Sequence, residues 1–526
     1  MRLWLAGRMS IRHIKVRLIK LSRSLIIPHF GVHLSYWEHK GGCIMRKIRL
    51  LANGALFIIF VFLAVLPAQY LLADKGQHYP QRGQAVANQL ILKLEKGRSP
   101  DEFLTEVNGH VVGSIPEPNI ILINYHNHVK AQKMAESLSR RNGVIFAEPN
   151  YLCSVPEVSQ NDQIIPDQNN PVYIAGVSPG PYYNQQATNS THSDSANLLS
   201  TGADIIVGVI DNGIDFDHPL FDGLADSTGY DFIDNDEDPS EEVGDLLGHG
   251  TFVSGLVKLM APDCELMPYR VFDENGVGNA YIISLAIYQA IDDSVDVINM
   301  SFNTYTASSS IQTAIAAAHQ AGITMVASSG NDSCSTICYP ASYDGVISVG
   351  AIDSLDYKAD FSNYGSYLDV VAPGTMIYSA LHTNYESDWG YWNGTSFSAP
   401  QVTGTCALIL ELRSSLPGDS VESQIRETAE KDLAWGTVVP QDTLYGYGYD
   451  DALQAVICLC RGDADNSGQI DSLDINYLVD YLNNGGPAPT PIFELGDVNC
   501  SGTINMLDVS YLINYLDNNG PAPCCQ

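Results

Sequence analysis

Between residues 201 and 456 short apolar runs alternate with longer helix-like segments, and this alternation constrains the fold more than any other feature of the chain. Residues 205–210, for example, form an apolar run that ends in Asp211. A strand that is apolar along its length is typical of a parallel sheet covered by helices on both faces. The pattern predicts an α/β domain with a doubly wound, mostly parallel sheet. We expect strands at 205–210, 264–272, 295–301, 323–328 and 346–351, and helices near 249–260, 280–293, 308–321, 396–413 and 419–431.

Four polar residues of this domain stand at strand ends or helix starts, each in a segment that contains glycine. Ser396 is a weak nucleophile unless a base takes its proton, and His249 has a side chain that titrates near neutrality. Asp211 would hold the imidazole tautomer, and the amide of Asn331 would stabilise an oxyanion together with the N–H of Ser396. Each residue alone also has an ordinary explanation, as a strand-end Asp, a core His, a turn Asn or an N-cap Ser. Together they favour acyl-transfer chemistry.

The segments that carry these residues are Asp211-Asn-Gly-Ile-Asp215, Gly248-His-Gly-Thr251, Ser328-Ser-Gly-Asn-Asp332 and Gly394-Thr-Ser-Phe-Ser-Ala-Pro400. In this chain order they resemble the subtilisin-like serine proteases, or subtilases. The resemblance covers 201–456 and implies a serine endopeptidase that cleaves protein or peptide substrates through an acyl-enzyme on Ser396. The alternative is a degenerate relative that kept the fold and lost activity.

The resemblance also implies where a substrate strand would bind. It would lie between an edge near Gly276 and Gly278 and an edge formed by Ser301, Phe302 and Asn303, adding main-chain hydrogen bonds. Ala327, Ser328 and Ser329 would form walls of the S1 pocket, and Cys338 would lie near its base. Two positions depart from the family pattern: Phe252 stands where a second His is frequent, and the segment 301–303 lacks a usual Gly.

Residues 80–155 precede this domain and have the order of a small α+β domain. We expect strands at 89–94 and 119–124 and helices at 100–107 and 128–140. The segment ends in Glu148-Pro-Asn-Tyr151 and resembles the ferredoxin-like inhibitory propeptide of subtilases, which implies an intramolecular inhibitor with its tail, near 151–166, in the active site. Residues 156–200 are rich in Pro, Asn, Gln and Ser and read as a linker or N-terminal arm.

The N-terminus has the features of an export signal. Residues 45–73 combine a basic start, an apolar run and small residues, which predicts a signal peptide and a secreted or cell-surface protein, with an uncleaved membrane anchor as the alternative. Residues 1–44 are interpreted as a spurious extension upstream of the true start. Residues 1–73 hold 11 of the 27 Lys and Arg and one of the 60 Asp and Glu, so the remainder carries a net charge of −43. This charge disfavours nucleic acid and stable membrane partners.

The last segment, 457–526, is an internal repeat with a 34-residue period, and each copy begins with a loop of alternating oxygen-bearing side chains. Such loops, with Gly at position 6, are typical of Ca²⁺ binding. Asp at position 12 and the lack of a preceding helix resemble a type I dockerin, a small all-α module, which implies two Ca²⁺ ions and a cohesin-type scaffold as partner. Intramolecular or cell-surface roles remain alternatives. The expected ligand positions are Asp463, Asp465, Ser467, Gln469, Asp471 and Asp474, and Asp497, Asn499, Ser501, Thr503, Asn505 and Asp508.

A second acidic loop lies just before His249. Asp231, Asp234, Asp236 and Asp238 crowd into eight residues, and one Ca²⁺ would relieve their repulsion, with a merely solvated loop as the alternative. The 11 cysteines favour disulfides over zinc, since no CxxC pair is present. We expect a bond between Cys334 and Cys338 and a clasp between the cysteines at 458–460 and those at 524–525.

Overall fold

The computed structural model describes residues 83–126, 129–159, 164–168, 179–225, 228–431 and 442–525, and the backbone of three strands before residue 50. The chain forms two compact units, Met1–His78 and Tyr79–Gln526. In the first unit, β1 (Ile26–Ile27), β2 (Val32–Glu38) and β3 (Cys43–Arg49) pair antiparallel. Apart from its overlap with β3, the expected signal peptide lies outside the described residues, so both N-terminal interpretations stay predictions.

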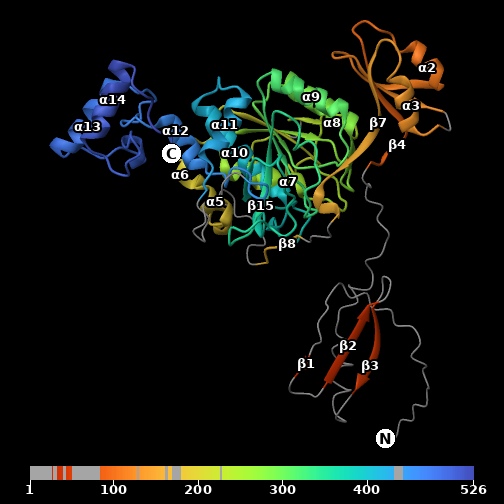
Figure 1. The fold of residues 1–526 in the computed structure, drawn as a ribbon, viewed down its shortest axis with the longest axis horizontal. Helices are drawn as coiled ribbons and strands as arrows, with labels where there is room; N and C mark the ends of the chain where they lie inside the picture. Colours follow the sequence, from red (N-terminus) through yellow and green to blue (C-terminus); the bar gives the residue numbers. More distant parts are fainter. Residues whose placement is uncertain are drawn as a thin grey trace. The chain divides into compact units, whose positions relative to one another are not determined.

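The second unit is built around a parallel sheet flanked by helices (Figure 1). The seven strands of this sheet have the order β10-β11-β9-β13-β14-β15-β16. The predicted doubly wound α/β fold is confirmed. Its strands are β9 (Ile206–Asp211), β10 (Tyr230–Asp231), β11 (Glu265–Arg270), β13 (Val297–Met300), β14 (Thr324–Ser328), β15 (Val346–Ile352) and β16 (Val370–Pro373). The short strand β10 and the strand β16 are additions to the five expected strands.

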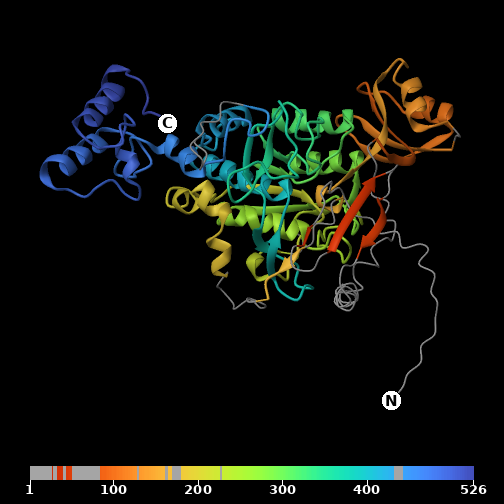
Figure 2. The same cartoon turned by 60° about the horizontal axis from the view of Figure 1, so that its bottom comes forward.

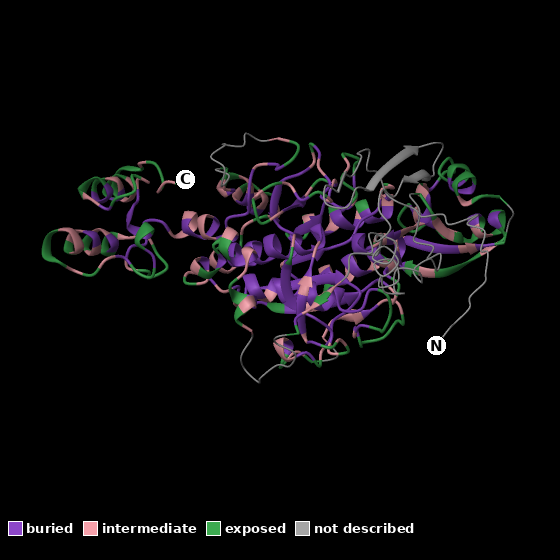
Figure 3. Cartoon of the chain, turned by 90° about the horizontal axis from the view of Figure 1, so that it is seen from below, coloured by how far each residue is buried: buried purple, intermediate pink, exposed green. Residues whose placement is uncertain are grey.

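Helices cover both faces of this sheet. One core joins alternate strand residues such as Val207 and Val209 to α7 (His249–Met260) and α10 (Ala399–Leu412). The other joins Ile210 and Ile298 to α8 (Ala280–Asp292) and α9 (Ser309–Gln320). Burial on both faces explains why these strands are apolar throughout, and Figure 3 shows the buried residues concentrated here. The outer helices α11 (Gly418–Thr428) and α12 (Ala452–Cys460) pack on the first core.

Residues 83–154 form a sheet with two helices. After the sequence resemblances, we call this segment the prodomain and the domain around the parallel sheet the catalytic domain. Alternate residues of the central prodomain strand face opposite sides: Leu90 and Leu92 pack under the prodomain's own helices, whereas Ile91 joins the core beneath α8. One face of the prodomain is therefore buried against the catalytic domain. The elements are β4 (Ala85–Leu94), α2 (Asp101–Val107), β5 (Gly109–Ile115), β6 (Ile120–Tyr125), α3 (Ala131–Leu138) and β7 (Val144–Ser154).

The expected linker 156–200 is folded over much of its described length (Figure 2, yellow). Tyr182 and Ala196 are buried in the catalytic core. Residues 165–166 of this segment pair with a hairpin of residues 377–392 to form a small antiparallel sheet. The elements are η2 (Pro156–Ser159), β8 (Ile165–Pro166), α4 (Gly180–Tyr183), α5 (Gln186–Thr191), α6 (Ser193–Ala196), β17 (Ile377–Ala380) and β18 (Trp389–Trp392).

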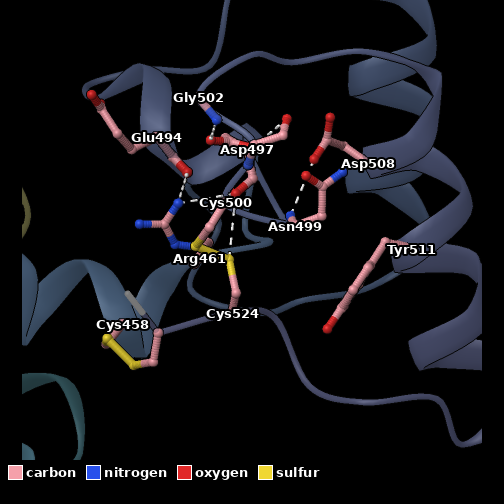
Figure 4. Close-up of a disulfide and its surroundings, with 12 residues drawn as sticks. Cys458, Arg461, Glu494, Asp497, Asn499, Cys500, Gly502, Asp508, Tyr511 and Cys524 are labelled. Atoms are coloured by element: carbon pink, nitrogen blue, oxygen red, sulfur yellow. Dashed lines mark hydrogen bonds between the residues drawn. A yellow bond between two sulfur atoms is a disulfide. The ribbon is translucent and has the colours of Figure 1, made fainter. Parts of the chain in front are cut away.

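The C-terminal repeat, which we call the dockerin region, folds as two loop–helix halves, with α13 (Ser472–Asn484) and α14 (Met506–Asn518) in contact around Leu478 and Leu512. Two disulfides lie in the described residues. Cys458–Cys525 joins the end of α12 to the chain terminus, as the expected clasp would, and Cys500–Cys524 braces the second loop (Figure 4).

The described residues do not show the expected Cys334–Cys338 bond, since the two disulfides found there join other cysteines. Cys338 is buried below Gly330, whereas the backbone of Cys334 is held by the side chain of Asn363. Among the helices that the structure describes, none is long and apolar enough to cross a membrane.

Candidate active site

Asp211, His249 and Ser396 meet at the carboxyl edge of the parallel sheet, where open α/β folds place their sites. Asp211 is the last residue of β9, His249 is the first of α7, and Ser396 lies in η4 (Thr395–Phe397) just before α10. His249 Nδ1 lies 2.8 Å from Asp211 Oδ1, and all three side chains are buried. The structure therefore brings together the Asp, His and Ser that the sequence singled out.

A fourth side chain, which the sequence did not indicate, stands between the imidazole and the serine. The Ser396 hydroxyl donates to Glu157 Oε2 at 2.8 Å, and the same oxygen lies 3.3 Å from His249 Nε2. Asn331, three residues beyond β14, donates its side-chain amide to Glu157 Oε1 at 2.8 Å. Glu157 belongs to the turn η2 that follows the last prodomain strand. Its carboxylate thus contacts the predicted nucleophile, base and oxyanion-stabilising residue at once.

The buried charges around His249 set its protonation. Burial by itself would lower the pKa of His249, but the carboxylates of Asp211 and Glu157 outweigh burial and raise this pKa to about 10. A group with such a pKa stays protonated at neutral pH and cannot accept a proton from Ser396. The arrangement with Glu157 in place is therefore an inactive one.

The last prodomain strand runs on into the predicted substrate cleft. Residues 152–154 of β7 pair antiparallel with β12 (Val277–Asn279), so Cys153 lies opposite Gly278. On the other side, Ser154 and Asn303 exchange both main-chain hydrogen bonds, at 3.3 and 3.1 Å. The Val155 N–H donates to the Gly276 carbonyl. Both edges expected to hold a substrate thus hold the prodomain tail.

The other predicted pocket residues lie close to Asn331. Ala327 and Ser328 end β14, and the Ser329 carbonyl accepts from the Asn363 amide at 2.9 Å. Cys338 is fully buried. Phe302 is also fully buried and packs on Phe272, so it supports the cleft edge from within.

Phe252, which departs from the family pattern, belongs to an aromatic cluster behind the histidine. Its ring centroid lies 4.6 Å from that of Phe397 and 5.9 Å from that of Trp392. Both partners in turn contact the His249 ring, at 5.5 and 5.6 Å between centroids. The cluster excludes water from one side of the imidazole and fixes its orientation.

Two side chains of the Glu148-Pro-Asn-Tyr151 motif bind helix N-termini of the catalytic domain. The Glu148 carboxylate accepts from the main-chain N–H groups of Ser309 and Ser310, at 2.7 and 2.9 Å, at the start of α9. Asn150 Oδ1 accepts from the Tyr281 N–H at 3.1 Å, at the start of α8. Helix N-termini have unpaired N–H groups and a positive dipole end, which favours a carboxylate there. These caps hold the prodomain on the catalytic domain beside α8 and α9 (Figure 1).

The acidic loop before His249 surrounds an arginine rather than an open cavity. Arg270, at the end of β11 and 2% exposed, pairs with Asp231, with Asp234 at 2.8 Å and with Glu242 at 3.0 Å. Burial opposes the charge of Arg270, but its hydrogen bonds to Asp234 and Asp231 outweigh burial and raise the pKa of the guanidinium. Asp236 and Asp238 accept from loop N–H groups instead. The structure does not bring the four predicted calcium ligands together, since the neighbouring strand supplies the positive charge.

The dockerin loops do fit a hard cation. Asp463, Asp465 and Asp474 each place one carboxylate oxygen within 4.8 Å of the other two. In the described ranges, no other group of three His, Cys, Asp or Glu residues brings its ligand atoms so close together. Asp463 and Asp474 are buried, and desolvation together with Asp465 and Asp463 raises the pKa of Asp474 to about 6. Gly468, at position 6, has φ +84°, as the sharp turn of a calcium loop requires.

The second dockerin loop repeats this hydrogen-bond pattern. Asp497 accepts from the Ser501 and Gly502 N–H groups at 2.9 and 2.8 Å, and Asp508 accepts from the Asn499 and Asn505 N–H groups at 3.1 and 2.8 Å. The buried Arg461 donates to the main-chain carbonyls of Glu494 and Asp497 (Figure 4). The donor set of both loops is therefore oxygen-rich and negative, which suits Ca²⁺.

Comparison with known proteins agrees with this geometry. Residues 202–448 match the Subtilase family, 73–150 the Fervidolysin N-terminal prodomain and 461–520 the Dockerin type I domain. A thermophilic serine proteinase of Bacillus sp. (strain AK1) is 31% identical over 381 residues, which cover 70% of this chain and 88% of the relative. The chain belongs to the subtilase family. It is a subtilisin-like serine protease with a prodomain and a calcium-binding dockerin module.

Other subtilases are similar over a shorter span. Subtilisin from Bacillus pumilus is 36% identical over 242 residues, 44% of this chain and 85% of the relative. The crystal structure of fervidolysin from Fervidobacterium pennivorans, described as a keratinolytic enzyme related to subtilisin, superposes with a TM-score of 0.58 at 24% identity. That superposition covers 72% of this chain and 62% of fervidolysin, and it shows a shared fold.

Proposed function

We propose that this protein is a secreted serine endopeptidase that is made as a self-processed zymogen. The observation that carries the proposal is the placement of Asp211, His249, Ser396 and Asn331 around one buried point at the sheet edge. Export is supported by the order of basic, apolar and small residues in 45–73.

Once the cleft is free, the substrate strand pairs with the edges at 276–278 and 301–303, as the prodomain tail does. The Ser396 oxygen attacks the scissile carbonyl while its proton passes to His249 Nε2. Asp211 holds the Nδ1 proton and stabilises the imidazolium, and Asn331 donates to the oxyanion. His249 then gives the proton to the leaving amine, an acyl-enzyme on Ser396 remains, and water hydrolyses it by the same route reversed.

The dockerin region binds two Ca²⁺ ions, one in each loop, and docks the enzyme on a cohesin-type scaffold. The matched loops and the exposed Leu473 and Leu507, at equivalent positions of α13 and α14, support a surface for a protein partner. Because Arg270 already pairs with Asp231 and Asp234, we assign no ion to the acidic loop at 231–238.

Hydrolysis of casein by the full chain tests the proposal. Replacing Ser396 by Ala should lower the rate about 10⁶-fold, the size of effect known for subtilisin. Asn331→Ala should lower it about 10²–10³-fold, again as in subtilisin. The exposed Ser335 gives a matched control, since Ser335→Ala should leave the rate unchanged. A Ser396→Ala protein from a protease-free host that cleaves casein at the wild-type rate would overturn the assignment.

A further inference from the structure

Glu157 occupies the catalytic centre by its side chain and not by its main chain. Glu157 is 3% exposed, and its carboxylate accepts from Ser396 and Asn331 at 2.8 Å each, while His249 Nε2 lies 3.3 Å away. Both groups act on a substrate in the proposed reaction: the Ser396 oxygen attacks the scissile carbonyl, and the Asn331 amide stabilises the oxyanion. Because the Ser396 hydroxyl proton is directed to Glu157, it is not directed to His249.

The register of the tail places no extended peptide in front of the nucleophile. Ser154 and Asn303 form a hydrogen-bonded pair, so the next pair of this antiparallel ladder would join residue 156 to Ser301. Residue 156 is Pro, which has no N–H to donate. The Ser301 carbonyl instead lies 3.2 Å from the Ser396 hydroxyl oxygen, and the chain leaves the cleft as the turn η2. The main-chain hydrogen bonds between the tail and this edge thus end before residue 156.

The catalytic domain leaves room for this carboxylate at Gly394. A Cβ at this position would overlap Glu157 Oε1, so a residue with a side chain here would displace the carboxylate. The site therefore has two polar donors, a cationic neighbour and an open wall, all matched to one carboxylate.

We propose that Glu157 is an internal plug, a side chain whose carboxylate fills the oxyanion position and separates Ser396 from His249 until the tail is released. The proposal rests on the proposed function and adds the residue that holds the uncut chain inactive. It separates two tasks of the prodomain: Glu148 and Asn150 dock it, whereas Glu157 silences the nucleophile.

Labelling of the uncut precursor by diisopropyl fluorophosphate tests the plug. The Ser396 oxygen bonds to phosphorus as fluoride leaves, so labelling reports whether the nucleophile is accessible and activated. Full-length wild type, Glu157→Ala and Glu157→Gln are followed over time, with cut and uncut chains separated by mass. Because hydrogen bonds to a charged group are strong, Glu157→Ala should label, or convert to the cut form, about 10- to 100-fold faster than wild type. Glu157→Gln keeps an acceptor but loses the charge and should lie between them.

Glu148→Gln is the matched control, since it weakens docking at α9 and leaves the plug in place. A threefold or smaller change in both Glu157 variants overturns the proposal, as does an equal acceleration by Glu148→Gln. If Glu157→Ala fails to fold, Glu157→Gln decides alone by the same threshold. Labelling of the mature wild type distinguishes a failure of the plug from a failure of the proposed function. A mature chain that never labels contradicts the proposed function. A mature chain that labels, while the Glu157 variants of the precursor label no faster than the wild-type precursor, contradicts the plug alone.

Discussion

Two acidic loops of this molecule resemble each other in sequence and differ in how their charge is balanced. In the loop at 231–238, Arg270 from the neighbouring strand pairs with Asp231 and Asp234 inside the fold. In the loop at 463–474, Asp463 and Asp474 are buried and accept from main-chain N–H groups of their own loop. The loop at 231–238 is thus paired with the guanidinium of Arg270, whereas the carboxylates of the loop at 463–474 are arranged to bind a metal ion. Carboxylate spacing alone therefore does not identify a calcium site, because the counter-charge can come from a strand that is distant in the sequence.

The largest expected effect is the response of the two loops to calcium removal. Metal binding and folding are coupled when a small module buries its ligands, and the dockerin region has a core of few apolar residues. In excess EDTA, amide hydrogen exchange of the full chain should show α13 and α14 losing their protection, while residues 231–242 stay as they are. Protection of α13 and α14 that persists in EDTA, or its loss at 231–242, would reverse the comparison.

Removing the internal cation should be the next largest effect. Arg270→Met keeps the length of the side chain and leaves Asp231, Asp234 and Glu242 unpaired, which should lower the free energy of unfolding by about 3–5 kcal/mol. Arg98→Met is the control: Arg98 pairs with Glu102, and both side chains are more than one-third exposed, so its loss should cost about 1 kcal/mol or less. Urea unfolding in a Ser396→Ala background, which prevents autolysis, measures both. An Arg270 variant no less stable than the control would show that the buried pairing adds little.

The smallest expected effect is a change in the calcium affinity of the dockerin loops. Position 5 is Ser in both dockerin loops, so each lacks a charge that stronger calcium loops have. Ser467→Asp should tighten calcium binding by the first loop about 3- to 10-fold, because added negative charge attracts the ion. Isothermal titration of the full chain checks this, with Ser501→Asp as the matched change in the second loop. Weaker binding in both variants would contradict the ligand assignment.

Much of the fold follows from the sequence because each of its patterns is local. Apolar runs such as 205–210 and 346–351 became strands within a residue or two, and the helix at 249–260 matches its expected bounds. The segment 156–200 was predicted less well: its polar composition indicated a linker, yet Tyr182 and Ala196 are anchored in the core. Tertiary burial of a few side chains decided its structure, and composition does not report such contacts.

The candidate site shows the same limit. Asp211, His249, Asn331 and Ser396 each stand in a glycine-rich motif that the sequence displays, and the structure brings them together. Glu157 and Arg270 have no such motif. Arg270 could have been suspected as a charge at the end of a buried strand, whereas Glu157 becomes meaningful only through contacts with residues more than 90 positions away.

The most direct test of Ser396 as the nucleophile is whether it cuts its own chain. The full-length wild type and Ser396→Ala proteins are produced in a protease-free host, and their intact masses and N-termini are compared. We expect the wild type to lose its prodomain by a cut beyond Tyr151, whereas Ser396→Ala should accumulate as one chain with the prodomain still attached. A Ser396→Ala protein that matures to the wild-type mass and N-terminus would contradict this role of Ser396.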